Sequence, residues 1–179
     1  MRVLMMSGGI DSTVCLYAEQ FDVALFVDYG QPAALVEWRI SQELSWRKCK
    51  WLPTKIGAPG ISGLLGEVDS TPQSAVVPGR NTLFIGLAAL IGARSVTLGC
   101  NGDDQAAFPD CRRKVLEPVA LACGVELRLP LCNLTKREVV AKGRKLGAPI
   151  AATISCYRGQ SPGWGTCAAC SLRAKADAP

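Results

Sequence analysis

The residues Ser7-Gly8-Gly9-Ile10-Asp11-Ser12 have the composition of an anion-binding turn. They follow a short apolar run and precede a helical pattern, and two adjacent glycines let a backbone turn tightly and approach a ligand closely. The free N–H groups and the positive end of the following helix favour a phosphate. The hydroxyls of Ser7 and Ser12 would add donors. Because the chain has neither a Walker A motif nor a dinucleotide fingerprint, the turn alone suggests a phosphate site and leaves a purely structural turn as the alternative.

The absence of histidine narrows the chemistry further. It excludes Ser-His-Asp and Cys-His nucleophile systems, every histidine-containing metal site, and the most common general base. The nine cysteines are an odd number, which fits poorly with a disulfide framework. The apolar start of the chain is too short for a signal peptide, and no apolar run approaches the roughly 18 residues of a membrane span. We therefore expect reduced thiols, a cytoplasmic location and no membrane association.

The elements that must position these residues alternate along the chain. Short β-branched runs predict strands over 2–6, 23–28, 51–56, 95–100 and 125–131, and amphipathic stretches predict helices over 11–20, 34–48, 81–93, 111–123 and 136–146. Strict alternation of this kind is typical of an α/β fold, here a doubly wound parallel five-stranded sheet covered on both faces. Ligands bind such sheets at the carboxyl ends of the strands, so we expect the motifs to meet there.

The length of 179 residues predicts one main domain, which we place at residues 1–150. Residues 151–179 carry cysteines but little periodicity, and they predict an irregular appendage packed on the same domain. The Gly-, Pro- and Ser-rich residues 57–79 predict a surface loop. The charge is uneven, with 8 basic and 11 acidic residues up to Asp110 and 12 basic and 4 acidic residues from Cys111 onward. A basic C-terminal half suits a nucleotide, a carboxylate or RNA, although ordinary surface charge explains it equally well.

The complete hexapeptide resembles the pyrophosphate loop of the N-type ATP pyrophosphatases, the PP-loop superfamily, whose pattern is Ser-Gly-Gly-x-Asp-Ser directly after the first strand. These enzymes cleave ATP between its α- and β-phosphates and form an adenylated substrate. The resemblance implies an adenine nucleotide alpha hydrolase-like fold. It assigns nucleotide binding to the loop and the helix behind it, namely Met6, Ser7, Gly8, Gly9, Ile10, Asp11, Ser12, Thr13, Val14, Cys15 and Leu16.

Further motifs resemble the 7-cyano-7-deazaguanine synthase (QueC) family over almost the whole chain. They are, in order, Asp28-Tyr29-Gly30-Gln31, Val77-Pro78-Gly79-Arg80-Asn81, Phe108-Pro109-Asp110-Cys111-Arg112, Leu134-Thr135-Lys136-Arg137-Glu138-Val139 and Thr153-Ile154-Ser155-Cys156-Tyr157-Arg158-Gly159. The family adenylates 7-carboxy-7-deazaguanine with ATP, displaces AMP with ammonia, and uses a second ATP to convert the amide to the nitrile.

The resemblance therefore implies an ATP-dependent carbon–nitrogen ligase of queuosine biosynthesis that uses Mg²⁺, forms a homodimer and needs no nucleic acid. Three alternatives stay open. The chain could stop at 7-amido-7-deazaguanine, it could be a PP-loop enzyme that modifies tRNA, or it could be a non-catalytic nucleotide-binding module. The chemistry agrees with a chain that lacks histidine, because a carboxylate oxygen is already a nucleophile and the enzyme must mainly position groups and stabilise charge.

The resemblance also implies roles for particular side chains. Arg80 is a fork-shaped donor for phosphate or for the substrate carboxylate, with a surface position at a helix start as the alternative. Lys136 faces phosphate or solvent. The full set that we expect to take part in the reaction is Asp11, Ser12, Arg80, Asp104, Asp110, Arg112 and Lys136.

Two carboxylates in this set have alternatives of their own. Asp104 and Asp110 would bind Mg²⁺ or accept the N–H groups of the guanine-like face. Asp110 could instead cap the following helix. Arg112 would then pair with Asp110 or contact the substrate.

The cysteines near the C-terminus suggest a zinc knuckle. The family carries four zinc-binding cysteines, and aligning that pattern with this chain places Cys156, Cys167 and Cys170 on three of the positions and Trp164 on the fourth. Structural zinc sites are nearly always four-coordinate, and without histidine a Cys₃His site is impossible. The outcomes left open are zinc on three thiolates with water or a distant cysteine, a weakened site, or no metal with Trp164 packed in its place.

Overall fold

The computed structural model describes residues 1–56, 76–160 and 165–177. Its centre is a five-stranded sheet in the order β3-β2-β1-β4-β5, and every adjacent pair is parallel. This confirms the predicted α/β class and the number of strands. The strands are β1 (Arg2–Met5), β2 (Val23–Asp28), β3 (Lys50–Lys55), β4 (Ser95–Thr97) and β5 (Glu126–Arg128).

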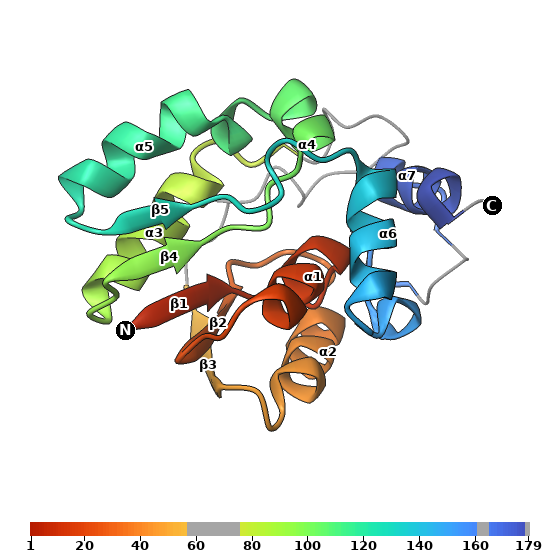
Figure 1. Cartoon of the computed structure of the whole chain (residues 1–179), viewed down its shortest axis with the longest axis horizontal. Helices are drawn as coiled ribbons and strands as arrows, with labels where there is room; N and C mark the ends of the chain where they lie inside the picture. Colours follow the sequence, from red (N-terminus) through yellow and green to blue (C-terminus); the bar gives the residue numbers. More distant parts are fainter. Residues whose placement is uncertain (57–75, 161–164, 178–179) are drawn as a thin grey trace.

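The order of the strands places the ligand site. From β1 the chain moves outward to β2 and β3 on one side, then returns to add β4 and β5 on the other (Figure 1). The direction of winding therefore reverses between β1 and β4, and the loops that leave these two strands diverge and open a crevice. The phosphate-loop motif follows β1, and Gly99 to Asp104 follow β4. Segments that are about 90 residues apart thus meet at one edge of the sheet.

Helices cover both faces of the sheet (Figure 1). Successive side chains of a strand point to opposite faces, and in β1 they alternate between two cores. Val3 and Met5 lie in a core with residues of α3 and α5, while Leu4 lies in a second core with residues of α1 and α6. The helices are α1 (Ile10–Ala18), α2 (Ala34–Ser45), α3 (Arg80–Leu90), α4 (Gly102–Ala107), α5 (Arg113–Ala122), α6 (Lys136–Lys145) and α7 (Ala168–Asp177).

Two helices differ from the sequence prediction. The structure has a helix at α7, where we expected an irregular appendage, and a short α4, where we expected none. Helix α4 has only 6 residues, too few for periodicity to show, and it is held by a capping box between Asn101 and Asp104. In α7 the buried residues include Arg173, which hides the apolar pattern of the buried face.

Several predicted elements were also too wide, among them the strand predicted over 125–131, which is β5 at Glu126–Arg128. The paired part of β4 ends at Thr97 rather than Cys100, because Gly99 turns against α1, where a Cβ would lie 3.0 Å from the Ser12 nitrogen. The helix predicted over 111–123 begins at Arg113, after a 3-10 turn at Pro109–Cys111.

The described residues after 150 pack on the domain that precedes them. The Ile154 N–H donates to the Gly8 carbonyl at 3.0 Å, so this segment contacts the phosphate loop directly. Arg173 of α7 donates to the carbonyls of Ile150 and Thr153 at 2.8 and 2.7 Å. The surface loop predicted over 57–79 lies mostly outside the described residues. Among the helices of the described part, none is long and apolar enough to cross a membrane.

Candidate active site

The turn after β1 depends on its first glycine. Gly8 has a φ of +78°, in the left-handed region that favours glycine. A Cβ there would also lie 3.0 Å from Ile40 Cγ2 and 3.1 Å from the Ser41 nitrogen. Conformation and close packing against α2 therefore both exclude a larger side chain. The result is a tight turn that aims the start of α1 at the crevice.

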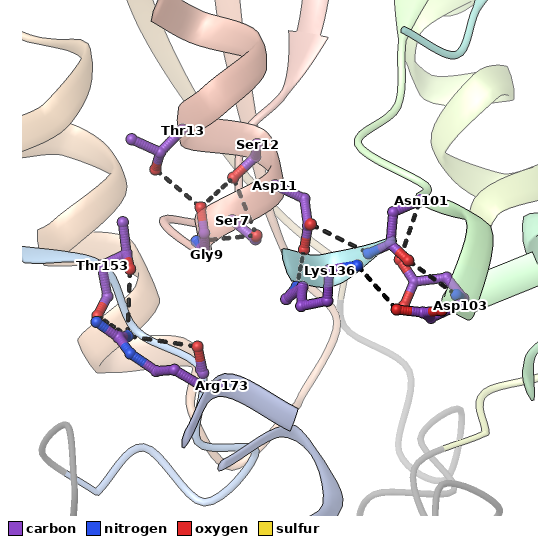
Figure 2. Close-up of polar contacts among 12 residues, drawn as sticks. Ser7, Gly9, Asp11, Ser12, Thr13, Asn101, Asp103, Lys136, Thr153 and Arg173 are labelled. Carbon is purple, nitrogen blue, oxygen red and sulfur yellow. Dashed lines mark hydrogen bonds and ion pairs between the residues drawn. The ribbon is translucent and has the colours of Figure 1, made fainter. Parts of the chain in front are cut away.

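The start of α1 presents donors to that crevice. The N-cap residue is Gly9, which offers no side-chain cap, so the first N–H groups of the helix are open to an anion. The Ser12 hydroxyl donates to the Gly9 carbonyl at 3.1 Å and lies 3.3 Å from the Ser7 hydroxyl, as Figure 2 shows. These contacts keep two hydroxyls beside the open helix end, which is the arrangement that binds phosphate.

A cluster of charges from three helices lies beside the turn (Figure 2). The Lys136 ammonium lies 2.5 Å from Asp11 Oδ2, and Asn101 Nδ2 donates to the other oxygen of Asp11 at 3.1 Å. The backbone N–H of Lys136 donates to Asp103 at 2.8 Å, which joins α6 to α4. A capping box of Thr135 and Glu138 begins α6 at Lys136 and so sets where this ammonium lies.

This cluster carries more negative than positive charge. Burial and the neighbouring Asp11 raise the pKa of Asp104 to about 6, although Lys136 and the Asn101 N–H counteract them. Burial lowers the pKa of Lys136, but Asp11, Asp104 and Asp103 outweigh burial and raise it overall. Lys136 therefore stays protonated, and one ammonium serves several carboxyl groups. A bound cation would relieve this imbalance.

The charge cluster and the open helix end line one cavity of about 260 Å³. Its inner wall is aromatic, and the rings of Tyr29 and Phe84 lie 5.8 Å apart at a tilt of 55°. Arg80 also lines the cavity, with its guanidinium 6.0 Å from the centre of the Phe84 ring and its Nε buried without a hydrogen-bond partner. Burial lowers the pKa of Arg80, but Tyr29, Cys111 and Asp110 raise it overall, so the guanidinium stays charged. The cavity thus combines anion-binding groups with aromatic side chains.

Most of the residues expected from the sequence meet in this cavity. They are Met6, Ser7, Gly9, Ile10, Asp11, Ser12, Arg80, Asp104 and Lys136. Gly8 shapes the turn from behind it. The remaining members of the predicted nucleotide-binding stretch are buried in α1, where Thr13 donates to the Gly9 carbonyl at 2.8 Å and the others fill the core: Val14, Cys15 and Leu16.

The structure places Asp110 and Arg112 outside the described lining of the cavity. Asp110 caps α3 rather than the helix that follows it, because its Oδ2 accepts the Asn81 N–H at 3.2 Å and its carbonyl accepts Asn81 Nδ2 at 2.9 Å. Arg112 donates through Nε to the Gln105 carbonyl at 2.9 Å. Both residues support the site from behind.

Three thiols gather where the C-terminal segment folds back. The sulfur atoms of Cys156, Cys167 and Cys170 all lie within 4.8 Å of one another, and this group could hold a metal ion. Cys167 and Cys170 are 3.5 Å apart. Burial raises the pKa of Cys167, but the N–H of Tyr157, followed by those of Cys170 and Ala169 in α7, lowers it overall and favours a thiolate. A Cβ on Gly165 would collide with the sulfurs of Cys170 and Cys156, so only glycine fits there.

Comparison with known proteins decides the family. A model of the family described as "Queuosine biosynthesis protein QueC" matches residues 1–178. The 7-cyano-7-deazaguanine synthase of Pseudomonas syringae pv. tomato is 34% identical over 204 aligned residues, covering 97% of this chain and 90% of the relative. The synthase of Thermoplasma acidophilum is 32% identical, covering 97% of this chain and 85% of the relative. The chain belongs to the QueC family. The resemblance seen in the sequence motifs is thereby confirmed.

A solved structure supports the fold. The U34-tRNA thiolase NcsA from Methanococcus maripaludis, solved with its [4Fe-4S] cluster, aligns with a TM-score of 0.53 at 17% identity. The alignment covers 98% of this QueC-family chain, which spans 63% of the thiolase chain. At this identity the likeness concerns the fold alone.

Some residues of the cavity escaped the sequence analysis. Gln31 ends the motif that begins at Asp28, but the sequence predicted no role for it. Glu37 lies inside an ordinary helical pattern, yet both residues line the cavity. Asn101 binds Asp11 and caps α4. A capping signature around Asn101 could have been found, whereas nothing in the sequence pattern marks Glu37.

Proposed function

We propose that this QueC-family chain converts 7-carboxy-7-deazaguanine, ammonia and two ATP to 7-cyano-7-deazaguanine, with release of AMP and pyrophosphate. It would thus be an ATP-dependent carbon–nitrogen ligase. The observation that carries the proposal is the open N-terminus of α1, which faces the same cavity as the Asp11–Lys136 pair and the aromatic wall. The relatives' name, 7-cyano-7-deazaguanine synthase, supplies the substrate class.

Each half of the reaction begins with an oxygen attacking the α-phosphorus of ATP. The substrate carboxylate attacks first, pyrophosphate leaves, and ammonia then displaces AMP to give the amide. The amide oxygen attacks a second ATP in the same way, and loss of AMP and of both amide protons leaves the nitrile. Neither attack requires a strong base, so positioning and charge stabilisation carry the catalysis.

The side chains of the cavity divide this work. The N–H groups at the start of α1, together with Ser7 and Ser12, would hold the leaving pyrophosphate. Lys136, tied to Asp11, would neutralise charge that develops on the phosphates. Arg80 would donate to the substrate. From their places behind the cavity, Asp110 would keep α3 and hence Arg80 in position, and Arg112 would anchor α4.

Carboxylates beside the charge cluster fit Mg²⁺, which prefers oxygen ligands. Asp103 and Asp104 line the cavity, and the raised pKa of Asp104 reflects negative charge that a cation would offset. Bound there, Mg²⁺ would supply charge neutralisation of the phosphates.

The three thiols fit a single zinc ion. Tetrahedral zinc with bonds of about 2.3 Å holds its sulfur ligands roughly 3.8 Å apart, and Cys167 and Cys170 lie 3.5 Å apart. Thiolates on an iron–sulfur cluster bind separate iron atoms and must stand farther apart. The fourth position that the family pattern assigns to cysteine is Trp164, which lies outside the described residues. We expect about one zinc per chain in protein purified without chelator, falling in Cys167→Ser, and metal-free protein of full activity would refute the site.

One assay tests the function. Purified protein is incubated with ATP, Mg²⁺, ammonium and 7-carboxy-7-deazaguanine, and the products are identified by mass. Nitrile with two AMP per turnover is the expected result, and amide with one AMP would instead support a variant that stops half-way. If no AMP forms, salt-sensitive binding of tRNA would favour a tRNA-related role, and binding of nucleotide alone a non-catalytic module.

Variants of the cavity test the assignment of side chains. We expect Ser12→Ala and Lys136→Met to lower the rate of AMP release by roughly 10-fold and 100-fold, since each removes a group that faces the transferred phosphate. Lys145→Met, at the exposed end of the same helix as Lys136, is the matched control. Full AMP release in either cavity variant would contradict the assignment.

We further propose a cytoplasmic homodimer. None of the nine cysteines forms a disulfide, as expected in a reducing compartment. Light scattering coupled to size exclusion would give the mass, and a monomer at micromolar concentration would contradict the dimer.

A further inference from the structure

The carboxylates that line the described part of the cavity differ in what holds them. Asp11 is paired with Lys136, Asp103 accepts the Lys136 N–H, and Asp104 is part of the capping box of α4. Glu37 stands apart, on α2, and accepts a hydrogen bond at 2.8 Å from the neutral amide of Gln31. The first three serve the phosphate end and the helix starts. The proposed reaction gives Glu37 no role.

Gln31 holds this carboxylate in one place. Its Oε1 accepts the N–H of Tyr29 at 2.9 Å, and its Nε2 donates both to the Val27 carbonyl, at 3.1 Å, and to Glu37. Gln31 is only 5% exposed, and each of its polar atoms is engaged. It is therefore a positioning residue that orients Glu37. Since a carboxylate can accept about four hydrogen bonds, Glu37 keeps capacity for a ligand.

The surroundings of Glu37 suit a flat, polar ring. Tyr29 and Phe84 give the neighbouring wall two aromatic faces. Burial raises the pKa of Glu37, and with the negative charge of Asp28 it outweighs the lowering by Gln31 and Arg80, so the pKa is raised overall. A ligand that donates hydrogen bonds to the carboxylate would shift the balance toward the ionised form.

We propose that Glu37 reads the donor edge of the substrate's six-membered ring, accepting the ring N–H and the exocyclic amino group of the guanine-like base. This inference rests on the function proposed above and adds the residue that recognises the base. Adenine presents a ring nitrogen acceptor beside its amino group. The lone pair of that nitrogen would face the carboxylate oxygens, and the two acceptors would repel each other. The edge that fits Glu37 is therefore that of the guanine-like substrate rather than that of ATP.

The test pairs a change in the protein with a change in the ligand. Wild type and Glu37→Gln are compared with 7-carboxy-7-deazaguanine and with the analogue that lacks the 2-amino group, 7-carboxy-7-deazahypoxanthine. We expect Glu37→Gln to raise KM for the normal substrate by roughly 10- to 100-fold, with KM for ATP unchanged. Wild type should reject the analogue by a similar factor, and the variant should lose most of that discrimination. A residue with a merely structural role would leave the discrimination intact.

Controls keep the outcome clear. Glu43→Gln changes an exposed carboxylate on the same helix and should behave as wild type. Glu37→Ala replaces Glu37→Gln if the latter does not fold, as judged by circular dichroism. Binding of both bases is also measured calorimetrically with a non-cleavable ATP analogue, so that recognition is read without turnover.

The outcomes separate the two proposals. Nitrile formation by a wild type whose discrimination persists in Glu37→Gln would overturn the role of Glu37 alone. A rise in KM for ATP rather than for the base would also overturn it. A wild type that neither binds the base nor releases AMP with it would overturn the proposed function and this inference with it.

Discussion

At the scale of single residues, Asp104 is a carboxyl group whose surroundings disfavour its charge. Its pKa rises from an ordinary value of 3.8 to about 6, because it is buried and lies near Asp11. A raised pKa in the folded state means that ionisation of Asp104 destabilises the fold as the pH rises from about 4 to about 6, with the full cost present above that range.

We therefore expect Asp104→Asn to stabilise the ligand-free protein at pH 7.5 by up to roughly 3 kcal/mol, the free energy that corresponds to this shift. Asparagine keeps an acceptor for the Asn101 N–H that Asp104 accepts at 3.2 Å. The advantage should shrink below pH 6 and vanish near pH 4. Urea denaturation across this range measures it, and a gain independent of pH would contradict the explanation.

Gly165 is a second position where a single added atom, a Cβ, would disturb the structure around it. A Cβ there would collide with two of the three clustered sulfurs, so we expect Gly165→Ala to lose most of the zinc that we propose for this site. Gly86→Ala is the matched control, because a Cβ at Gly86 meets nothing within 4 Å and lies in a helix, where alanine is favoured. Metal analysis of both variants checks the prediction, and equal zinc content would show that the sulfurs do not need this close approach.

At the scale of elements, the start of α6 decides where the Lys136 ammonium lies. Thr135 accepts the Glu138 N–H, and Glu138 accepts the Thr135 N–H at 2.7 Å, so the helix begins at Lys136. We expect Thr135→Ala to lower the free energy of unfolding by about 1 kcal/mol and to slow AMP release, because Lys136 loses its fixed position.

Thr82→Ala is the control for that change, since Thr82 is exposed in the first turn of α3 and caps nothing. Chemical denaturation and AMP release are measured together. A loss of stability with unchanged AMP release would show that Lys136 reaches its place without the capping box.

At the scale of the whole molecule, the C-terminal segment connects the core to the phosphate loop. Arg173 is 9% exposed and donates to the carbonyls of Ile150, which begins a 3-10 turn, and of Thr153, which follows that turn. The N–H of Ile154 donates to the Gly8 carbonyl. We expect Arg173→Met to lower the free energy of unfolding by about 1–3 kcal/mol, because the Thr153 carbonyl loses its donor, while the Ile150 carbonyl keeps the bonds from the Thr153 hydroxyl and N–H. We also expect it to raise KM for ATP.

Arg144→Met provides the comparison, because within the described part of the chain Arg144 forms an exposed ion pair with Asp177 at 3.2 Å and no buried contact. Such pairs contribute about 1 kcal/mol or less. If both variants unfolded at the same urea concentration, the buried contacts of Arg173 would not hold the segment in place.

The sequence by itself determined the sheet and the phosphate loop. Both depend on local rules: β-branched runs alternate with amphipathic runs, and two glycines between a strand and a helix permit a tight turn. Hence five strands, five of the helices and the residues from Ser7 to Ser12 could be predicted from neighbours in the chain. The three cysteines could be named in the same way, because their spacing resembles a known family.

Only the tertiary structure decided which distant residues serve the site. Glu37 comes to the cavity because α2 packs beside the turn, and Asp110 caps α3 because its own segment folds against a helix that begins 30 residues earlier in the chain. Helix α7 is held in place by the bonds from Arg173 to buried carbonyls, and no local sequence pattern predicts these bonds. Contacts between residues far apart in the chain depend on the packing of the folded chain, and the periodicity of the sequence does not predict that packing.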